Sequence, residues 1–219
     1  PRAGGRRRGA GAVARRLTLP AVLVLVLASC FSASGEIRVS DDSGRTVVLE
    51  QAARRVVSLY AGHSENLLAL GAGDAIAGVS ASDDPALFPG VPVLPMRADG
   101  ERILALRPDL VLLRPQGEAA AAGVIRLLER GGVPVASLSP PTWETMEAYL
   151  VRLGALVGAA DPARPWREAV SALERTVPAG KRPRVFLESS SRGLMTCSPS
   201  SWAARVIALA GGENAASDA

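Results

Sequence analysis

Two arginines are the side chains of this chain whose chemistry and position most suggest a binding site. Arg97 and Arg114 each follow a short apolar run, Val93-Leu94 and Leu110–Leu113 respectively. A guanidinium presents its N–H donors in a planar fork that matches carboxylates and catecholates, so a pair of them favours an anionic ligand. The alternative for each arginine is an ion pair with a structural carboxylate.

The other candidates for ligand contact are Tyr60, His63, Glu188 and Ser190. His63 is the only histidine, and it could contact a ligand or be satisfied by the backbone at a helix start. Sites for bare metal ions combine several histidines and carboxylates, and no such cluster is visible, so we expect no protein-bound metal. Tyr60 could pack against a chelate ring or cap the core.

An alternation of strands and helices must position these residues. Apolar runs that predict strands lie at 56–59, 76–79, 93–94, 110–113, 133–138 and 184–188, and a hairpin around 41–44 precedes them. Repeated strand–helix units predict an α/β fold in which helices cover both faces of a parallel sheet. In such sheets ligands bind beyond the carboxyl ends of the strands, where Tyr60, Arg97 and Arg114 fall.

The alternation breaks between residues 142 and 182, where two helical stretches follow one another without a strand. We interpret residues 37–160 as an N-terminal α/β lobe, 161–182 as a connecting helix and 183–219 as the start of a C-terminal α/β lobe. One strand and one helix cannot form a sheet with its own core, so we expect this second lobe to be incomplete. A ligand would then lie between the lobes, with Glu188 and Ser190 facing it.

The first 30 residues have the pattern of an export signal. Six arginines lie within residues 1–16, and the apolar run from Leu17 to Leu27 ends in Leu27-Ala28-Ser29-Cys30. Because this run is too short to span a bilayer, it favours a signal peptide over residues 1–29. The ending resembles the bacterial lipoprotein box, which implies that Cys30 is acylated and that 30–36 is a lipid-attached linker. An ordinary anchor that ends in cysteine is the alternative, and Arg15-Arg16 leaves the Sec and twin-arginine routes open.

Charge and missing motifs exclude other classes of protein. Beyond the arginine-rich tail the chain carries 19 basic and 21 acidic side chains, so its basic character gives no argument for nucleic acid. The sequence has no Gly-x-Ser-x-Gly elbow, phosphate-binding glycine loop or His-Glu-x-x-His motif. We therefore predict a binding protein that is not an enzyme; a surface lipoprotein without a small ligand is the less favoured alternative.

Several short blocks occur in the order and spacing of one known family. They are Asp41–Arg45, Arg55–Leu59, Leu68–Gly71, Gly78–Ser80, Glu101–Ile103, Leu106–Val111, Gly131–Val135 and Ala210–Asn214. Through these blocks, over nearly all of residues 37–219, the chain resembles the bacterial substrate-binding lipoproteins of ABC importers for ferric siderophores and cobalamin. In that family one long helix joins two α/β lobes.

The resemblance implies an exported, lipid-anchored monomer that captures a metal chelate and delivers it to a permease dimer. A ferric siderophore is the expected cargo, and cobalamin, another corrinoid or haem is the alternative. Arg114 stands where the cobalamin binder of the family has a cleft aromatic, which favours an anionic cargo. Glu101 matches the first-lobe glutamate that docks onto permease arginines. No cofactor is expected apart from the chelate itself.

Overall fold

The computed structural model describes residues 35–95, 99–188, 190 and 195–216. The proposed signal peptide, Cys30 and Arg97 lie outside the described residues, so the sequence predictions made for them remain predictions. Within the described part of the chain, no helix is long and apolar enough to cross a membrane.

Five short strands form a parallel sheet in the order β5-β4-β3-β6-β7. They are β3 (Val56–Ser58), β4 (Ile76–Ser80), β5 (Val93–Leu94), β6 (Leu110–Leu113) and β7 (Val135–Ser137). The chain runs outward from β3 through β4 to β5, and then returns to the other side of β3 to add β6 and β7. The predicted α/β fold with a parallel sheet is confirmed, and the strand order reverses beside β3.

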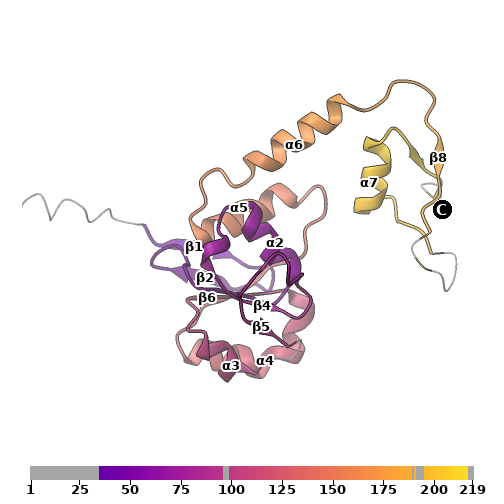
Figure 1. Cartoon of the computed structure of the whole chain (residues 1–219). Coiled ribbons are helices and arrows are strands. Elements are labelled where there is room, and N and C mark those ends of the chain that lie inside the picture. Colours follow the sequence, from indigo (N-terminus) through magenta and orange to yellow (C-terminus); the bar gives the residue numbers. More distant parts are fainter. Residues whose placement is uncertain (1–34, 96–98, 189, 191–194, 217–219) are drawn as a thin grey trace, which may run out of the picture. The chain divides into compact units, whose positions relative to one another are not determined.

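Helices cover both faces of this sheet (Figure 1). Helices α2 (Ala61–Ala69) and α5 (Met146–Val157) lie on one face, and α3 (Gly100–Ala105) and α4 (Pro115–Arg130) lie on the other. Successive strand side chains point to opposite faces. Accordingly, Val56 and its neighbours pack with α2 and α5, whereas Val57 and its neighbours pack with α3 and α4. Both faces are apolar, as a parallel sheet buried between two helical layers requires.

A β-hairpin precedes the sheet, as the turn residues predict. Strands β1 (Ile37–Ser40) and β2 (Thr46–Leu49) pair antiparallel, and Gly44 adopts the positive φ that closes the turn. Val39, Val47 and Leu49 are buried in the same core as α5, which attaches the hairpin to the lobe.

The C-terminal part of the chain contains α6 (Arg164–Arg175), β8 (Arg184–Val185), α7 (Trp202–Leu209) and β9 (Glu213–Asn214). A short 3-10 turn, Gly73–Ala75, connects α2 to β4 in the first part of the chain. Strands β8 and β9 pair in parallel. The first of the two helical stretches expected between residues 142 and 182, α5, begins only at Met146, because Thr142 and Thr145 bond to each other in a turn. The lobe boundaries remain predictions.

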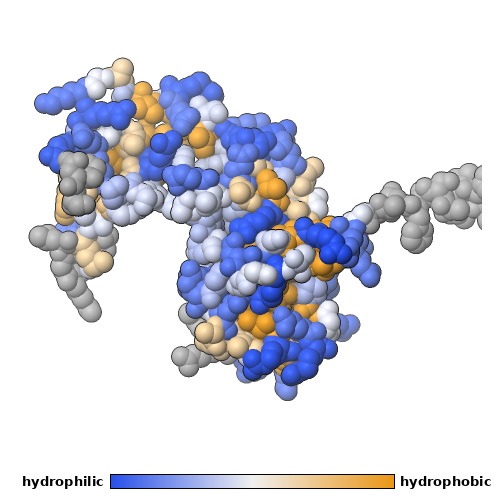
Figure 2. All heavy atoms as spheres, turned by 180° about the vertical axis from the view of Figure 1, so that it is seen from behind, coloured by the Kyte–Doolittle hydropathy of each residue, from blue (hydrophilic) through white to orange (hydrophobic). Residues whose placement is uncertain are grey.

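All three tryptophans of the chain meet in one cluster. Trp143, from the segment after β7, contacts Trp166 of α6 and Trp202 of α7, with ring centroids 4.7 and 5.4 Å apart. The indole N–H of Trp202 donates to the carbonyl of Pro141 over 2.9 Å. Edge-to-face contacts of this kind stabilise the packing of the segments that carry the rings. Over the surface seen in Figure 2, polar residues predominate and apolar residues form smaller groups among them.

Candidate functional site

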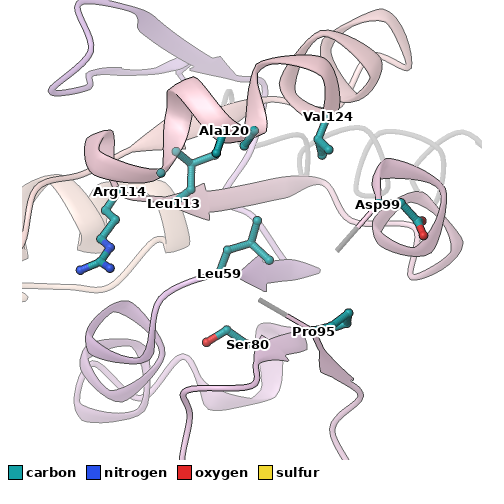
Figure 3. A pocket seen from close by; sticks show the side chains of 10 residues that line it. Leu59, Ser80, Pro95, Asp99, Leu113, Arg114, Ala120 and Val124 are labelled. Carbon is teal, nitrogen blue, oxygen red and sulfur yellow. The ribbon is translucent and has the colours of Figure 1, made fainter. Parts of the chain in front are cut away.

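A pocket of about 650 Å³ lies at the carboxyl edge of the parallel sheet. Its walls come from residues at or just after the ends of β3, β4, β5 and β6, from the N-cap of α3 and from one face of α4. They are Leu59, Ser80, Pro95, Asp99, Leu113, Arg114, Gly117, Ala120, Ala121 and Val124. Figure 3 shows Leu59 between Arg114 at one end and Asp99 at the other. This is the place where the strand order reverses, which is the usual ligand position in open α/β sheets.

The α4 wall of the pocket is made of small side chains. Gly117, Ala120, Ala121 and Val124 recur with the spacing i, i+3, i+4 and i+7, which places them on one helical face. A Cβ atom added at Gly117 would meet nothing within 4 Å. Our sequence reasoning missed this wall, although the spacing of its small residues was a signal that could have revealed it.

Arg114 and Tyr60, two of the predicted ligand contacts, lie together. The guanidinium carbon of Arg114 lies 4.9 Å from the centroid of the Tyr60 ring, within range of a cation–π contact. Arg114 is exposed at the start of α4 and lines the pocket. Among the described residues no carboxylate forms an ion pair with it. The alternative of a structural acid partner therefore gains no support.

His63 is buried inside the lobe, where neighbouring groups satisfy its ring nitrogens; this agrees with the alternative to ligand contact that the sequence left open. Its ring has no exposed surface, and its Nε2 lies 3.2 Å from the carbonyl oxygen of Leu113. Since a carbonyl only accepts, Nε2 carries the proton, and Nδ1 accepts from the hydroxyl of Tyr149 over 2.8 Å. Burial lowers the pKa of His63 to about 4 and raises that of Tyr149. His63 is thus a neutral link between α2, β6 and α5.

The remaining sequence candidates are not brought into this pocket by any described contact. Glu188 is exposed after β8, and Ser190 forms an isolated antiparallel bridge with Met195. Glu101 is exposed in the first turn of α3, where a carboxylate also suits the helix dipole. Arg97 belongs to a segment outside the described residues. The ligand-contact and docking roles of these residues stay predictions.

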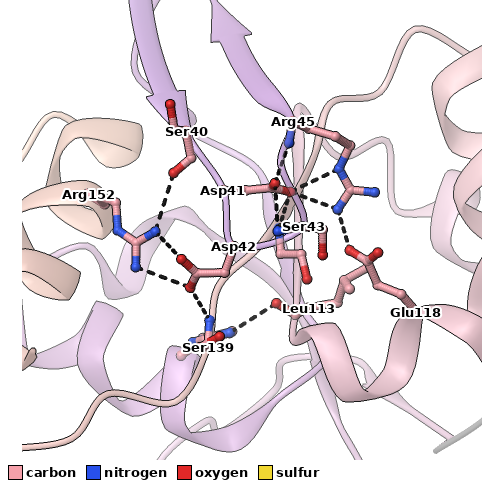
Figure 4. Close-up of polar contacts among 11 residues, drawn as sticks. Ser40, Asp41, Asp42, Ser43, Arg45, Leu113, Glu118, Ser139 and Arg152 are labelled. Carbon is pink, nitrogen blue, oxygen red and sulfur yellow. Dashed lines mark hydrogen bonds and ion pairs between the residues drawn. The ribbon is translucent and has the colours of Figure 1, made fainter.

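The hairpin turn is fixed to the same edge of the lobe by two aspartates (Figure 4). The Asp41 carboxylate accepts from the backbone N–H groups of Ser43, Arg45 and Ser137 and from the Arg45 guanidinium, over 2.7–3.1 Å. Burial alone would raise the pKa of Asp41, but the hydrogen bonds from Arg45 and Ser137 leave it below its usual value.

The second aspartate and a glutamate extend this network. Asp42 accepts from the backbone N–H of Ser139 and from both terminal nitrogens of Arg152. Arg45 also donates to Glu118, one turn into α4. No group of three or more histidine, cysteine, aspartate or glutamate side chains among the described residues is placed to hold a metal ion.

The fold and the pocket together define a class of α/β protein that offers a preformed small-molecule pocket at the carboxyl edge of a parallel sheet. Residues 56–219 match the family described as periplasmic binding protein, and the chain belongs to that family.

Two relatives agree with this assignment. A vitamin B12-binding protein of Vibrio parahaemolyticus is 30% identical over 169 residues, which cover 73% of this chain and 60% of that protein. An uncharacterized ABC transporter substrate-binding lipoprotein of Bacillus subtilis, YvrC, is 30% identical over 105 residues, which cover 47% of this chain and 33% of that protein. The chain thus spans at most about 60% of the length of these two relatives, both of which are named as binding proteins.

Comparison with a solved structure bears on the fold, and not on the function. The crystal structure of a possible iron-binding, periplasmic solute-binding protein from Staphylococcus epidermidis superposes with a TM-score of 0.64 at 24% identity. The superposition covers 75% of this chain and 67% of that one.

Proposed function

We propose that this protein is the extracytoplasmic substrate-binding component of an ABC importer, and that it captures an anionic metal chelate, a ferric siderophore, for delivery to the permease. Arg114 carries the proposal: it lines a pocket at the carboxyl edge of the sheet and has no acid partner among the described residues. Family membership and the names of the relatives support the class.

The lining of the pocket favours a ligand that is apolar in its body and anionic at one point. Leu59, Leu113 and Val124 supply apolar surface, while the guanidinium of Arg114 lies at one end. A charge-assisted hydrogen bond to this guanidinium contributes roughly 1.5–3 kcal/mol. A neutral ligand that covered it would leave the charge partly desolvated and unpaired. A ferric catecholate offers aromatic rings to the apolar lining and negative charge to the guanidinium.

The decisive experiment replaces Arg114. Arg114→Ala should weaken binding of the ferric complex of 2,3-dihydroxybenzoate by about tenfold or more, because the charge-assisted bonds are lost. Arg114→Lys should recover part of the loss, since lysine keeps the charge but lacks the planar fork. Affinity is measured by tryptophan fluorescence, and the melting temperature is recorded for each variant.

Arg126→Ala is the matched control, because Arg126 is exposed on the same helix and does not line the pocket. An early-melting Arg114→Ala variant with unchanged affinity would make Arg114 a structural residue. Binding of cyanocobalamin in preference to the ferric complex would support the second candidate function, cobalamin capture. The vitamin B12-binding relative is the observation that favours this candidate. Arg97 remains a predicted second contact.

We also propose that the protein is held at the membrane by lipid on Cys30, a residue outside the described part of the chain. Cys30→Ser should shift the protein from the membrane fraction to the soluble fraction, because acylation requires the thiol. Immunoblotting of the two fractions measures the shift, and Cys197→Ser, which removes the other cysteine, is the control. A Cys30→Ser variant that stays in the membrane would indicate an uncleaved anchor.

Docking to the permease is proposed through Glu101. Its side chain is exposed on α3, on the sheet face opposite α2 and α5, and it is therefore accessible to basic groups of a partner. The exposure of Glu101 and the family membership of the chain support this docking role.

A further inference from the structure

The network at the hairpin turn, formed by Asp41, Arg45 and Glu118, ends on an acid that would otherwise compete with a ligand for Arg114. Arg114 is the N-cap residue of α4 and Glu118 lies in the first turn of that helix, so their long side chains start about one helical turn apart. An arginine and a glutamate at this spacing are ordinarily free to pair. In this structure Glu118 pairs with Arg45 of the hairpin, and Arg114 lies over the ring of Tyr60.

Arg45 is held in place independently of Glu118. Its guanidinium also donates to the Asp41 carboxylate, over 2.7 Å from Nη2 and 2.9 Å from Nε, and the Asp41 side chain is fully buried. Three backbone N–H groups anchor the same carboxylate. Arg45 and Glu118 keep only 29% and 22% of their side-chain surface exposed, so solvent screens their pairing less than that of a fully exposed pair.

We infer that Arg45 is a positioning residue for ligand capture: by holding Glu118 it keeps that carboxylate away from Arg114, whose guanidinium stays available to an anionic ligand. This inference rests on the proposed function. It assigns to the Asp41–Arg45–Glu118 network a role in affinity as well as in folding. Without Arg45, Glu118 would turn toward Arg114, and a ligand would first have to displace it.

A double-mutant cycle tests the inference. Arg45→Gln should weaken binding of the ferric complex of 2,3-dihydroxybenzoate by about fivefold. This is the change in affinity that corresponds to the strongest exposed ion pairs, such as the one that Glu118 and Arg114 would form. Adding Glu118→Gln removes the competing charge, and the double variant should return to within about twofold of the wild-type affinity. If Arg45 only supports the fold, the second substitution cannot restore binding, and an affinity as low as that of Arg45→Gln or lower would overturn the inference.

A crystal structure of ligand-free Arg45→Gln separates this inference from the proposed function. The Arg114 guanidinium should lie within about 4 Å of the Glu118 carboxylate, the distance of an ion pair, and no longer over Tyr60. An Arg114 that remains over Tyr60 would overturn the inference whatever the protein binds. If the wild-type protein does not bind the ferric complex, the proposed function fails, and this structure still decides the role of Arg45.

Discussion

Replacing Asp41 by alanine should lower the free energy of unfolding by about 3 kcal/mol, because it leaves a partly buried guanidinium and backbone donors without their acceptor. The Asp41 side chain has no exposed surface and accepts from Ser43, Arg45 and Ser137. It therefore holds both the turn of the hairpin and the end of β7. Urea denaturation, followed by circular dichroism, measures the loss.

The matched control lies on the same hairpin. Glu36 pairs with Arg38, but both side chains are about half exposed, so Glu36→Ala should change the stability by less than about 0.5 kcal/mol. Asp41→Asn should fall between the two, since the amide keeps one acceptor oxygen but loses the charge. Equal losses for Asp41→Ala and Glu36→Ala would show that the buried network contributes nothing beyond an exposed ion pair.

Acidification from pH 7 to pH 5 should destabilise the protein by about 2 kcal/mol through His63 alone. The pKa of His63 is lowered from 6.5 to about 4 by burial, so the unfolded chain binds the proton first as the pH falls. The full stability is present above the unfolded pKa. It is lost progressively as the pH falls from that value toward the folded pKa.

The window from pH 7 to pH 5 isolates His63 from the carboxylates that pair in the folded state. The pKa values of Asp41, Asp42 and Glu118 are lowered, so the stability that they contribute is lost only at more acidic pH. His63→Gln keeps a donor near the Leu113 carbonyl but does not titrate. This variant should be less stable at pH 7, yet its stability should be nearly constant over the window in urea denaturation. A wild-type protein with the same flat profile would contradict the burial of a neutral histidine.

The sequence alone determined the layering of the lobe. Short apolar runs between turn residues, such as Val56–Ser58 and Leu110–Leu113, predict strands buried between two helical layers, and the structure places them there. The turn chemistry of Asp41–Gly44 likewise determined the hairpin. These features follow from local preference and periodicity, which are properties of the sequence itself. The same reasoning located Tyr60 and Arg114 at the ends of strands.

Tertiary structure decided what the side chains at those positions do. Nothing local distinguishes His63, whose ring turns inward to Tyr149, from Tyr60 three residues earlier, which remains partly exposed beneath Arg114. Their partners lie 86 and 54 positions away along the chain, and contacts over such separations depend on how helices pack across the sheet. The pairing of Glu118 with Arg45, 73 positions apart, is of the same kind. A carboxylate one turn from an arginine looks like its partner in the sequence, and only the folded hairpin supplies the competing guanidinium.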